Sequence, residues 1–256
     1  MTAATTAPDT APVTVLLGAT GGIGAATARR LATAGHRLHL LGRDADRLAA
    51  LAADVGAAGT ATVDARDVDG VGAAVEAVAA AEGRLDGAAS LVGSLLLKAA
   101  HQTSGAEWDE VLATNLTSAF ALLRAAAPRM RGTGGSIVLM STAVVRTGMP
   151  NHEAIAAAKG GVEGLVRAAA STYGSTGVRV NAVAPGLTRT PLTARITANP
   201  AQEEASAQLH ALGRIGEADE VAGAVAWLLD PATTWVTGQV LGVDGGLGSA
   251  RPRARA

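Results

Sequence analysis

The sequence predicts a doubly wound α/β fold, in which a parallel sheet is covered by helices on both faces. Short apolar segments alternate with helical segments from residue 13 to residue 243. The predicted strands are apolar almost without interruption, as expected of strands that are buried on both faces. No linker or internal repeat breaks the pattern, so we expect a single domain over residues 12–248.

The predicted elements follow one another with short connections. A first strand at 13–17 leads into a glycine-rich turn and a helix that ends at Gly35. The remaining strands are expected at 36–42, 61–65, 85–93, 135–141, 178–186 and 238–246. The remaining helices are expected at 44–55, with Asp44 as N-cap, and at 67–83, 107–131, 154–174 and 217–229. The segment 187–213 is mostly small and polar and has no aromatic residue.

Composition excludes several classes of function. Charged residues make up 17% of the chain and the net charge is −1, so no long-range field favours nucleic acid. The absence of cysteine excludes disulfides and thiolate zinc sites, and it suits a cytoplasmic protein. No apolar run approaches the roughly 18–20 residues that span a bilayer. Residues 1–11 lack the features of a signal peptide and are expected to form a flexible tail, as is the basic segment 249–256.

A glycine-rich loop, GATGGIG, occupies residues 18–24. Gly18, Gly22 and Gly24 follow a predicted strand and open a predicted helix. A tight turn of this kind lets backbone N–H groups approach a pyrophosphate at the helix N-terminus. Because the spacing differs from the common G-x-G-x-x-G pattern, a glycine-rich turn without a ligand remains the alternative.

Several motifs together resemble the short-chain dehydrogenase/reductase family. GATGGIG resembles its TGxxxGIG loop, with Leu17 in place of the leading threonine. The segments VDARD (63–67), ATNLTSAF (113–120), SIVLMST (136–142) and RVNAVAPGLTRTPL (179–192) resemble further family motifs in the same order. The resemblance covers about 12–247 and implies a Rossmann fold. It also implies a homotetramer, or else a dimer, that pairs through the helices at 107–131 and 154–174.

The resemblance implies a nicotinamide cofactor and a small-molecule substrate. Asp64 is expected near the adenine, and the turn at 185–190 near the carboxamide. The full set of expected cofactor contacts is Gly18, Thr20, Gly21, Gly22, Ile23, Gly24, Arg43, Asp64, Ala65, Leu91, Gly93, Lys159, Pro185, Gly186, Thr188 and Thr190.

The end of the second strand predicts NADP(H) rather than NAD(H). An acidic residue there would bind the ribose 2′-hydroxyl, whereas an arginine accommodates a 2′-phosphate. The discriminating positions hold Gly42, which leaves room, and Arg43, which supplies charge. The alternative is that Arg43 is a solvated loop residue.

The resemblance also implies a catalytic site with one departure. Lys159 and Asn115 match the family's lysine and asparagine, and Thr142 keeps a hydroxyl at the serine position. The adjacent Ser141 should point to the other face of the strand. The position of the proton-donating tyrosine, however, holds Ile155. The single tyrosine, Tyr173, lies about 27 Å along the same helix and cannot substitute.

Proton delivery must then come from another group or be unnecessary. His152, three residues before Ile155, is the first candidate for a general acid, because imidazole titrates near neutrality. A helix start with Asn151 as cap and Glu153 in the first turn is the alternative interpretation of this segment. His101 is a weaker candidate to face the pocket. An iminium substrate, or an enone protonated from solvent, would need no such acid.

Three further histidines, His36, His39 and His210, are expected to be structural.

Two functional hypotheses remain from the sequence. The first is an NADPH-dependent oxidoreductase that reduces a small C=O, C=N or activated C=C. The second is an NADP(H)-binding protein without redox activity, such as a repurposed isomerase or cyclase, a sensor or an inactive partner subunit. Ile155 favours the second, as do Ser90 and Leu91, which replace two amide side chains of the family's NNAG motif.

Overall fold

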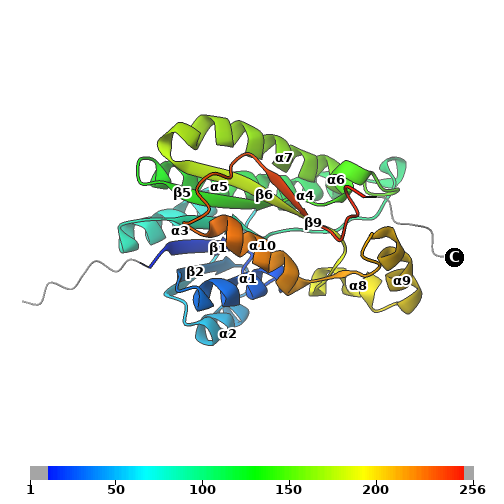
Figure 1. Ribbon diagram of the computed structural model, residues 1–256, viewed down its shortest axis with the longest axis horizontal. Coiled ribbons are helices and arrows are strands. Elements are labelled where there is room, and N and C mark those ends of the chain that lie inside the picture. The colour runs from blue at the N-terminus through cyan, green and yellow to red at the C-terminus, as the bar shows by residue number, and fades with distance from the viewer. Residues whose placement is uncertain (1–10, 251–256) are drawn as a thin grey trace, which may run out of the picture.

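The computed structural model describes residues 11–250 and confirms the predicted fold (Figure 1). Seven parallel strands form one sheet in the order β3-β2-β1-β4-β5-β6-β9. Their bounds are β1 Val13–Leu17, β2 Arg37–Gly42, β3 Gly59–Thr62, β4 Gly87–Ser90, β5 Gly135–Met140, β6 Val178–Pro185 and β9 Val240–Val243. Most of the expected tails, residues 1–10 and 251–256, lie outside the described residues.

The strand order reverses between β1 and β4, because β1 pairs in parallel with β2 on one side and with β4 on the other. The chain runs outward from β1 to β3 and then crosses back to β4. In open sheets of this kind, ligands bind in the crevice beyond the carboxyl ends of the strands at the point of reversal. The loop that follows β1 is the glycine-rich loop, so the topology places it at this crevice.

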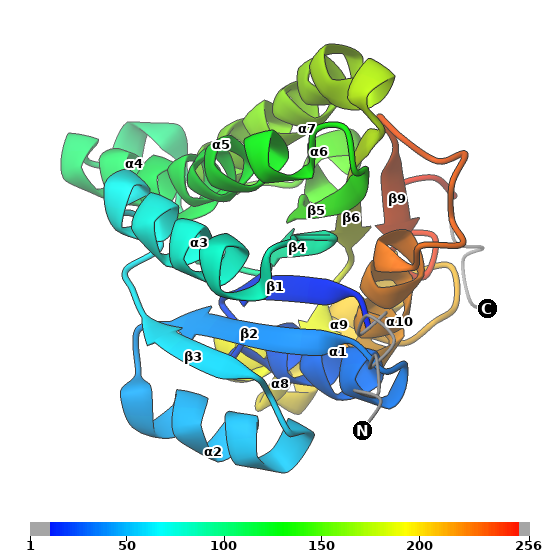
Figure 2. The same ribbon diagram turned by 90° about the vertical axis from the view of Figure 1, so that its left-hand side faces the viewer.

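Helices cover both faces of the sheet (Figure 2). One face carries α1 Gly22–Thr33, α2 Ala45–Val55 and α10 Ala218–Leu229, and the other carries α3 Val68–Glu82, α5 Ser118–Met130 and α7 Glu153–Tyr173. Side chains of β1 alternate between the two cores, with Leu16 in one and Val15 and Leu17 in the other. Burial on both faces explains why the strands are continuously apolar.

The long helix expected at 107–131 is interrupted by a π-helical turn. It consists of α4 Gly105–Leu112, the π turn Ala113–Thr117 and α5. It begins earlier than expected because Ser104 caps it: the Ser104 hydroxyl accepts from the Glu107 amide, and the Glu107 carboxylate accepts from the Ser104 amide. The expected Asp44 cap of α2 is confirmed by its bond from the Arg47 amide.

The polar segment 187–213 is largely structured. Its first residues form β7 Thr188–Arg189, which pairs with β8 Gly216–Glu217 in a small second sheet. Three short helices follow, namely η4 Pro191–Thr193, α8 Ala194–Thr197 and α9 Pro200–Leu209. Asn199 caps α9 and proline occupies the first helical position, a combination that starts helices efficiently.

The start of α7 differs from the helix-start interpretation of the sequence. The helix begins at Glu153 and its N-cap is His152, so the assignment of Asn151 as cap is wrong. Asn151 adopts a left-handed conformation with φ of 64°, which asparagine tolerates better than most residues. Its carbonyl accepts a hydrogen bond from the Lys98 amide and thereby joins α7 to the segment after β4.

The residues 11–250 contain no helix that is both long enough and apolar enough to cross a membrane.

Candidate active site

A cavity of about 550 Å³ lies beyond the carboxyl ends of β4, β5 and β6. It is lined by the segment after β4, the end of β5, the start of α7, the turn after β6 and the helices α8 and α9. Ile23 of the glycine-rich loop also lines it. The four catalytic residues expected from the sequence, Asn115, Thr142, His152 and Lys159, all line this cavity.

Lys159 is a buried amine in the wall of the cavity. Its side chain is carried by α7 and the residue is 6% exposed. Nζ donates to the Val92 carbonyl at 3.3 Å. Because burial penalises the ammonium form, the pKa of Lys159 falls to about 8. The amine is therefore mostly protonated at neutral pH and can donate hydrogen bonds or a proton.

Asn115 lies in the π turn and is almost fully buried. Its Oδ1 accepts from the Ser94 amide at 3.1 Å, and its Nδ2 donates to Ser94 Oγ at 2.8 Å and to the Val111 carbonyl at 3.0 Å. Short π segments within α-helices often occur at functional sites. Here the π turn and Ser94 together fix the amide at the cavity.

Gly93 is the point where Lys159 and Asn115 converge. A Cβ placed on Gly93 would lie 3.5 Å from Asn115 Oδ1 and 3.9 Å from Lys159 Nζ. The glycine therefore allows a polar group, or a ligand, to approach both side chains at once.

Ile155 occupies the position where the resemblance predicts a tyrosine. It precedes Lys159 by one helical turn, is 4% exposed and lines the cavity.

Of the two neighbouring hydroxyl residues, Thr142 is better placed to bind a substrate. Its Oγ1 makes one long hydrogen bond, at 3.5 Å to the Pro185 carbonyl, and can exchange it for a substrate oxygen. Ser141 Oγ instead donates to the buried Glu163 carboxylate at 2.9 Å, in line with the expected difference in direction.

The five histidines lie in different environments. His152 lines the cavity, and its Nδ1 lies 2.8 Å from the Pro150 carbonyl. His101, the weaker candidate, is exposed and lies outside the cavity: it belongs to a short 3₁₀ turn, Ala100–Gln102, whose side chains face solvent. His36 and His39 are structural as expected and contact Thr14 and Glu82.

His210 is structural too, yet it also lines the cavity. The Leu187 amide can only donate, so Nε2 must accept its bond at 3.2 Å. Nδ1 then carries the hydrogen and donates to the Ser206 carbonyl at 2.8 Å. These two bonds fix a neutral ring that joins α9 to the turn after β6.

The glycine-rich loop has the shape that a pyrophosphate requires. Gly18 has φ of 81°, and a Cβ on Gly24 would collide with the Gly18 carbonyl. A Cβ on Gly22 would lie 2.9 Å from the Thr190 side chain, so the loop also touches the turn after β6. The first amides of α1 have no carbonyl partner within the helix and are available to an anion. The residues present therefore fit a dinucleotide.

The residues beyond β2 and β3 carry charge near the expected adenine end. The Arg66 guanidinium holds the pKa of Asp64 at about 2, with Arg43 contributing through its charge. Arg66 contacts both Asp64 oxygens and also Glu110, so the carboxylate expected near the adenine is already paired. Arg43 is exposed, and a Cβ on Gly42 would meet only ordinary contacts, so packing does not require that glycine.

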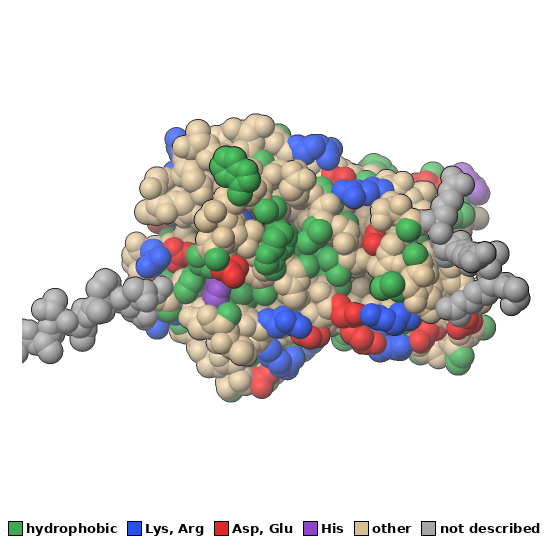
Figure 3. Space-filling view, viewed as in Figure 1, with side chains coloured by type: hydrophobic (Ala, Val, Ile, Leu, Met, Phe, Trp, Pro, Cys, Tyr) green, Lys and Arg blue, Asp and Glu red, His purple; other side chains and the backbone are tan. Residues whose placement is uncertain are grey.

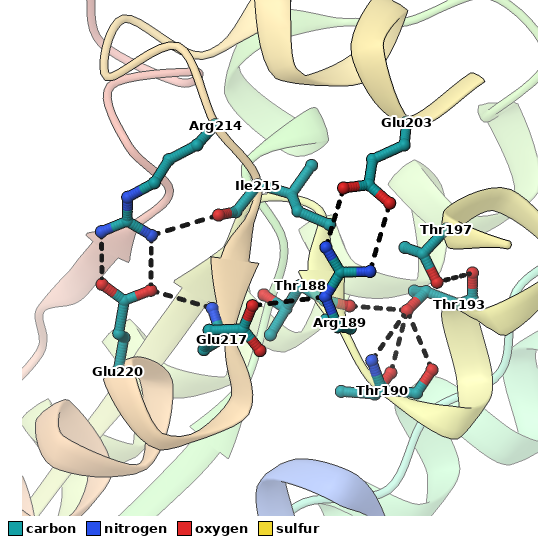
Figure 4. Close-up of polar contacts among 10 residues, drawn as sticks. All are labelled: Thr188, Arg189, Thr190, Thr193, Thr197, Glu203, Arg214, Ile215, Glu217 and Glu220. Atoms are coloured by element: carbon teal, nitrogen blue, oxygen red, sulfur yellow. Dashed lines mark hydrogen bonds and ion pairs between the residues drawn. The ribbon is translucent and has the colours of Figure 1, made fainter. Parts of the chain in front are cut away.

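A network of polar contacts holds β7 and its neighbours together (Figure 4). Arg189 makes two hydrogen bonds to Glu203 of α9, at 2.7 and 3.1 Å, and one to Glu217 of β8 at 3.3 Å. On the face shown in Figure 3, acidic and basic side chains mix along a band between α10 and α9. Arg189 thus connects the cover of the cavity to the body of the domain.

Thr190 belongs to the same network through its contact with Thr193. Thr193 Oγ1 donates to the Thr188 carbonyl at 2.6 Å and lies 3.1 Å from Thr190 Oγ1. The expected carboxamide contacts at Thr188 and Thr190 therefore sit in a turn whose conformation is already fixed by hydrogen bonds.

Sequence reasoning missed the residues that act through long-range contacts. Ser94 and Glu163 lie in no quoted motif, Arg189 has no role in the motif that contains it, and their partners are 14 to 28 residues away. Only the contact of Glu163 could have been anticipated, because a carboxylate on the buried face of a helix needs a hydrogen-bond partner.

Comparisons with known proteins agree with this geometry. The family model described as enoyl-(acyl carrier protein) reductase matches residues 18–248. The chain is 38% identical over 239 residues to cis-4-hydroxycyclohexanecarboxylate dehydrogenase of Sinomonas cyclohexanicum, covering 91% of this chain and 95% of that protein. It is 35% identical to D-threitol dehydrogenase of Mycolicibacterium smegmatis, covering 91% and 92%.

The fold of this chain also matches that of a solved structure. The structure of a short-chain type dehydrogenase/reductase from Mycobacterium ulcerans superposes with a TM-score of 0.89 and 33% sequence identity, covering 94% of this chain and 91% of that one. With the strand order, the glycine-rich loop and the lysine–asparagine pair, these matches lead to one conclusion. The chain belongs to the short-chain dehydrogenase/reductase family of oxidoreductases.

Proposed function

We propose that this chain is an NADPH-dependent oxidoreductase that reduces a small organic C=O, C=N or activated C=C, with a proton donor other than tyrosine or with none. One observation carries the proposal. Lys159, Asn115 and Thr142 line a single cavity that also touches the glycine-rich loop, while Ile155 fills the position expected for a tyrosine. We further propose a cytoplasmic homotetramer or dimer.

The cofactor would be held by the residues that fit it. The loop Gly18–Gly24 and the N-terminus of α1 would bind the pyrophosphate, and the turn from Pro185 to Thr190 would bind the carboxamide. The bound cofactor supplies a hydride from its nicotinamide ring.

The chain's own residues would then manage the charge on the substrate. The Thr142 hydroxyl can donate to a substrate oxygen, and the Lys159 ammonium stabilises negative charge that develops there. Asn115 and Ser94 hold the wall of the cavity beside the lysine. If a proton is transferred, His152 is the first candidate donor, because it lines the same cavity and histidine is the most frequent general acid in enzymes.

A panel of substrates tests the proposal directly. The protein is mixed with NADPH and with ketones, imines and enones, and the loss of NADPH absorbance is followed. We expect turnover on at least one class. Tight NADPH binding with no turnover on any class would favour the non-redox alternative, which the isoleucine at position 155 and the Ser90–Leu91 pair support.

Replacement of His152 by alanine is expected to lower the turnover of a carbonyl substrate about 10²-fold, if this ring delivers the proton. His101→Ala is the matched control, since it removes an exposed imidazole outside the cavity. Turnover numbers at saturating NADPH are compared for the two variants. An unchanged rate in His152→Ala removes the imidazole as the acid and leaves the reductase proposal in place.

Replacement of Arg43 by serine is expected to weaken NADPH binding about 10- to 100-fold, because a charge-assisted hydrogen bond to the 2′-phosphate is lost. Affinity for NADH, which has no such phosphate, should stay within about twofold. Dissociation constants for both cofactors are measured in the wild type, in Arg43→Ser and in Arg29→Ser, an exposed arginine of α1 that pairs with Asp54. Tighter binding of NADH than NADPH by the wild type would contradict the assignment.

A further inference from the structure

The lining of the cavity contains few charged side chains. None of the described residues that line it is an aspartate, a glutamate or an arginine. Its lysine, Lys159, is mostly protonated at neutral pH and lies at the inner end beside Asn115 and Gly93. His210 contributes no charge, because its two hydrogen bonds fix the neutral ring.

A charged substituent would therefore find no partner in the outer part of the cavity. A carboxylate or phosphate far from the reacting carbon would have no guanidinium to bind, and an ammonium would have no carboxylate. Burying a charge without a partner is strongly unfavourable. The lining thus selects against ionised substituents at the end of the substrate that is remote from Lys159.

The outer part of the cavity is mainly apolar, although the exposed Gln202 of α9 also lines it. Four leucines of the lining are still 37–52% exposed, which places them where the cavity meets solvent: Leu95, Leu97, Leu192 and Leu209. They come from two segments that are distant in sequence, the stretch after β4 and the region from η4 to α9. Single exposed leucines are common, but a group of them around one opening is characteristic of a binding surface.

Further apolar side chains line the cavity. They include Ile155, Val144 and Met149. A ligand that extends from Lys159 to the mouth would therefore touch mainly aliphatic carbon. A polyhydroxylated ligand would lose hydrogen bonds to water there and gain few in return.

We infer that the substrate is an uncharged and largely apolar molecule, whose reducible group lies beside Lys159 and Thr142 and whose hydrocarbon part extends to the leucines at the mouth. The inference rests on the proposed function for the position of the reducible group. The polarity of the occupant, however, follows from the lining alone and can be tested without turnover.

Binding is measured by displacement of Nile red, a neutral fluorescent dye, from the protein saturated with NADPH. The competitors are 2-alkanones from 2-butanone to 2-undecanone, together with methyl 8-oxononanoate and its free acid. Affinity is expected to rise about threefold to fourfold with each methylene. The free acid should bind at least about tenfold more weakly than its ester, which exceeds the threefold to fourfold effect of the missing methyl group and reflects the charge.

Two leucine variants test where the hydrocarbon part of the ligand binds. Leu192→Ser and Leu209→Ser should each weaken 2-undecanone about threefold to tenfold and leave 2-butanone within about twofold. Leu212→Ser is the matched control, because Leu212 is 69% exposed and lies outside this cavity. Stronger binding of the acid than the ester, or equal effects of Leu192→Ser and Leu212→Ser, would overturn the inference.

The two proposals fail in different ways. If displacement follows chain length but no ketone, imine or enone consumes NADPH, the redox function is wrong and the inferred polarity of the occupant stands. If NADPH is consumed but only with ionised or polyhydroxylated compounds, the inference is overturned and the redox function stands.

Discussion

The Ile155→Tyr variant is expected to reduce simple ketones about 10²-fold faster than the wild-type protein. Ile155 is 4% exposed, lines the cavity and lies one helical turn before Lys159. A phenol projecting from this position would enter the cavity beside the ammonium, which favours ionisation of the phenol and so brings its pKa closer to neutrality. The cavity of about 550 Å³ can accept the larger ring.

Ile155→Phe is the matched control, because it introduces the same ring without the hydroxyl. Turnover of 2-butanone at saturating NADPH is compared in the wild type and both variants. Equal rates in the tyrosine and phenylalanine variants would show that proton delivery does not limit ketone reduction here. A gain with ketones but none with iminium salts would indicate that the isoleucine is suited to substrates that need no acid.

Lys159→Met is expected to lower activity and raise stability at the same time. Loss of the ammonium should reduce turnover by about 10²- to 10³-fold, as for other groups that stabilise developing negative charge. Burial lowers the pKa of Lys159 from its ordinary value of 10.5 to about 8. That difference corresponds to about 3 kcal/mol of unfavourable free energy for burying the charge at pH 7. Methionine fills similar space without a charge.

The stability gain should depend on pH in a defined direction. Below pH 8 lysine is protonated in both the folded and the unfolded chain, so the full cost is present in the wild type. Between pH 8 and 10.5 the unfolded chain binds more protons, so the wild type gains stability as the pH rises. The advantage of Lys159→Met should therefore be largest near pH 7 and nearly gone by pH 10.5.

Urea unfolding at pH 7 and pH 10 measures this difference. Arg167→Met, on the exposed side of the same helix, controls for a general effect of added methionine. A variant that is less stable than the wild type at pH 7 would show that the Lys159 amine contributes more through its contacts than its burial costs.

The fold could be predicted because its signals are local. The apolar run of β1 and the glycines after it lie within twelve residues and define a strand, a turn and a helix start. The lysine–asparagine pair was also predictable, since each lies in a motif that resembles the family. The direction of Ser141 followed from strand alternation alone.

Other features depend on contacts that no local pattern reveals. Asn151 would be a good helix cap by composition, but the amide of Lys98 binds its carbonyl and the chain takes a left-handed turn instead. The connection of α9 to β8 through Arg189 joins three segments that are separated by 14 to 28 residues. The neutral state of His210 depends on the Leu187 amide, which lies 23 residues away.

The π turn at residues 113–117 has a consequence for the length of the chain in this region. A π turn accommodates an additional residue, and each residue of an α-helix advances the side chains by about 100°. Deleting one residue between α4 and α5 would restore a regular helix and leave α5 in nearly the same phase, because the wider turn absorbs the extra residue. The face of α5 that carries Leu122, Ala126 and Met130 would then stay against the sheet. The extra residue is therefore not needed for the packing of the core, and what its removal would change is the position of Asn115 at the cavity.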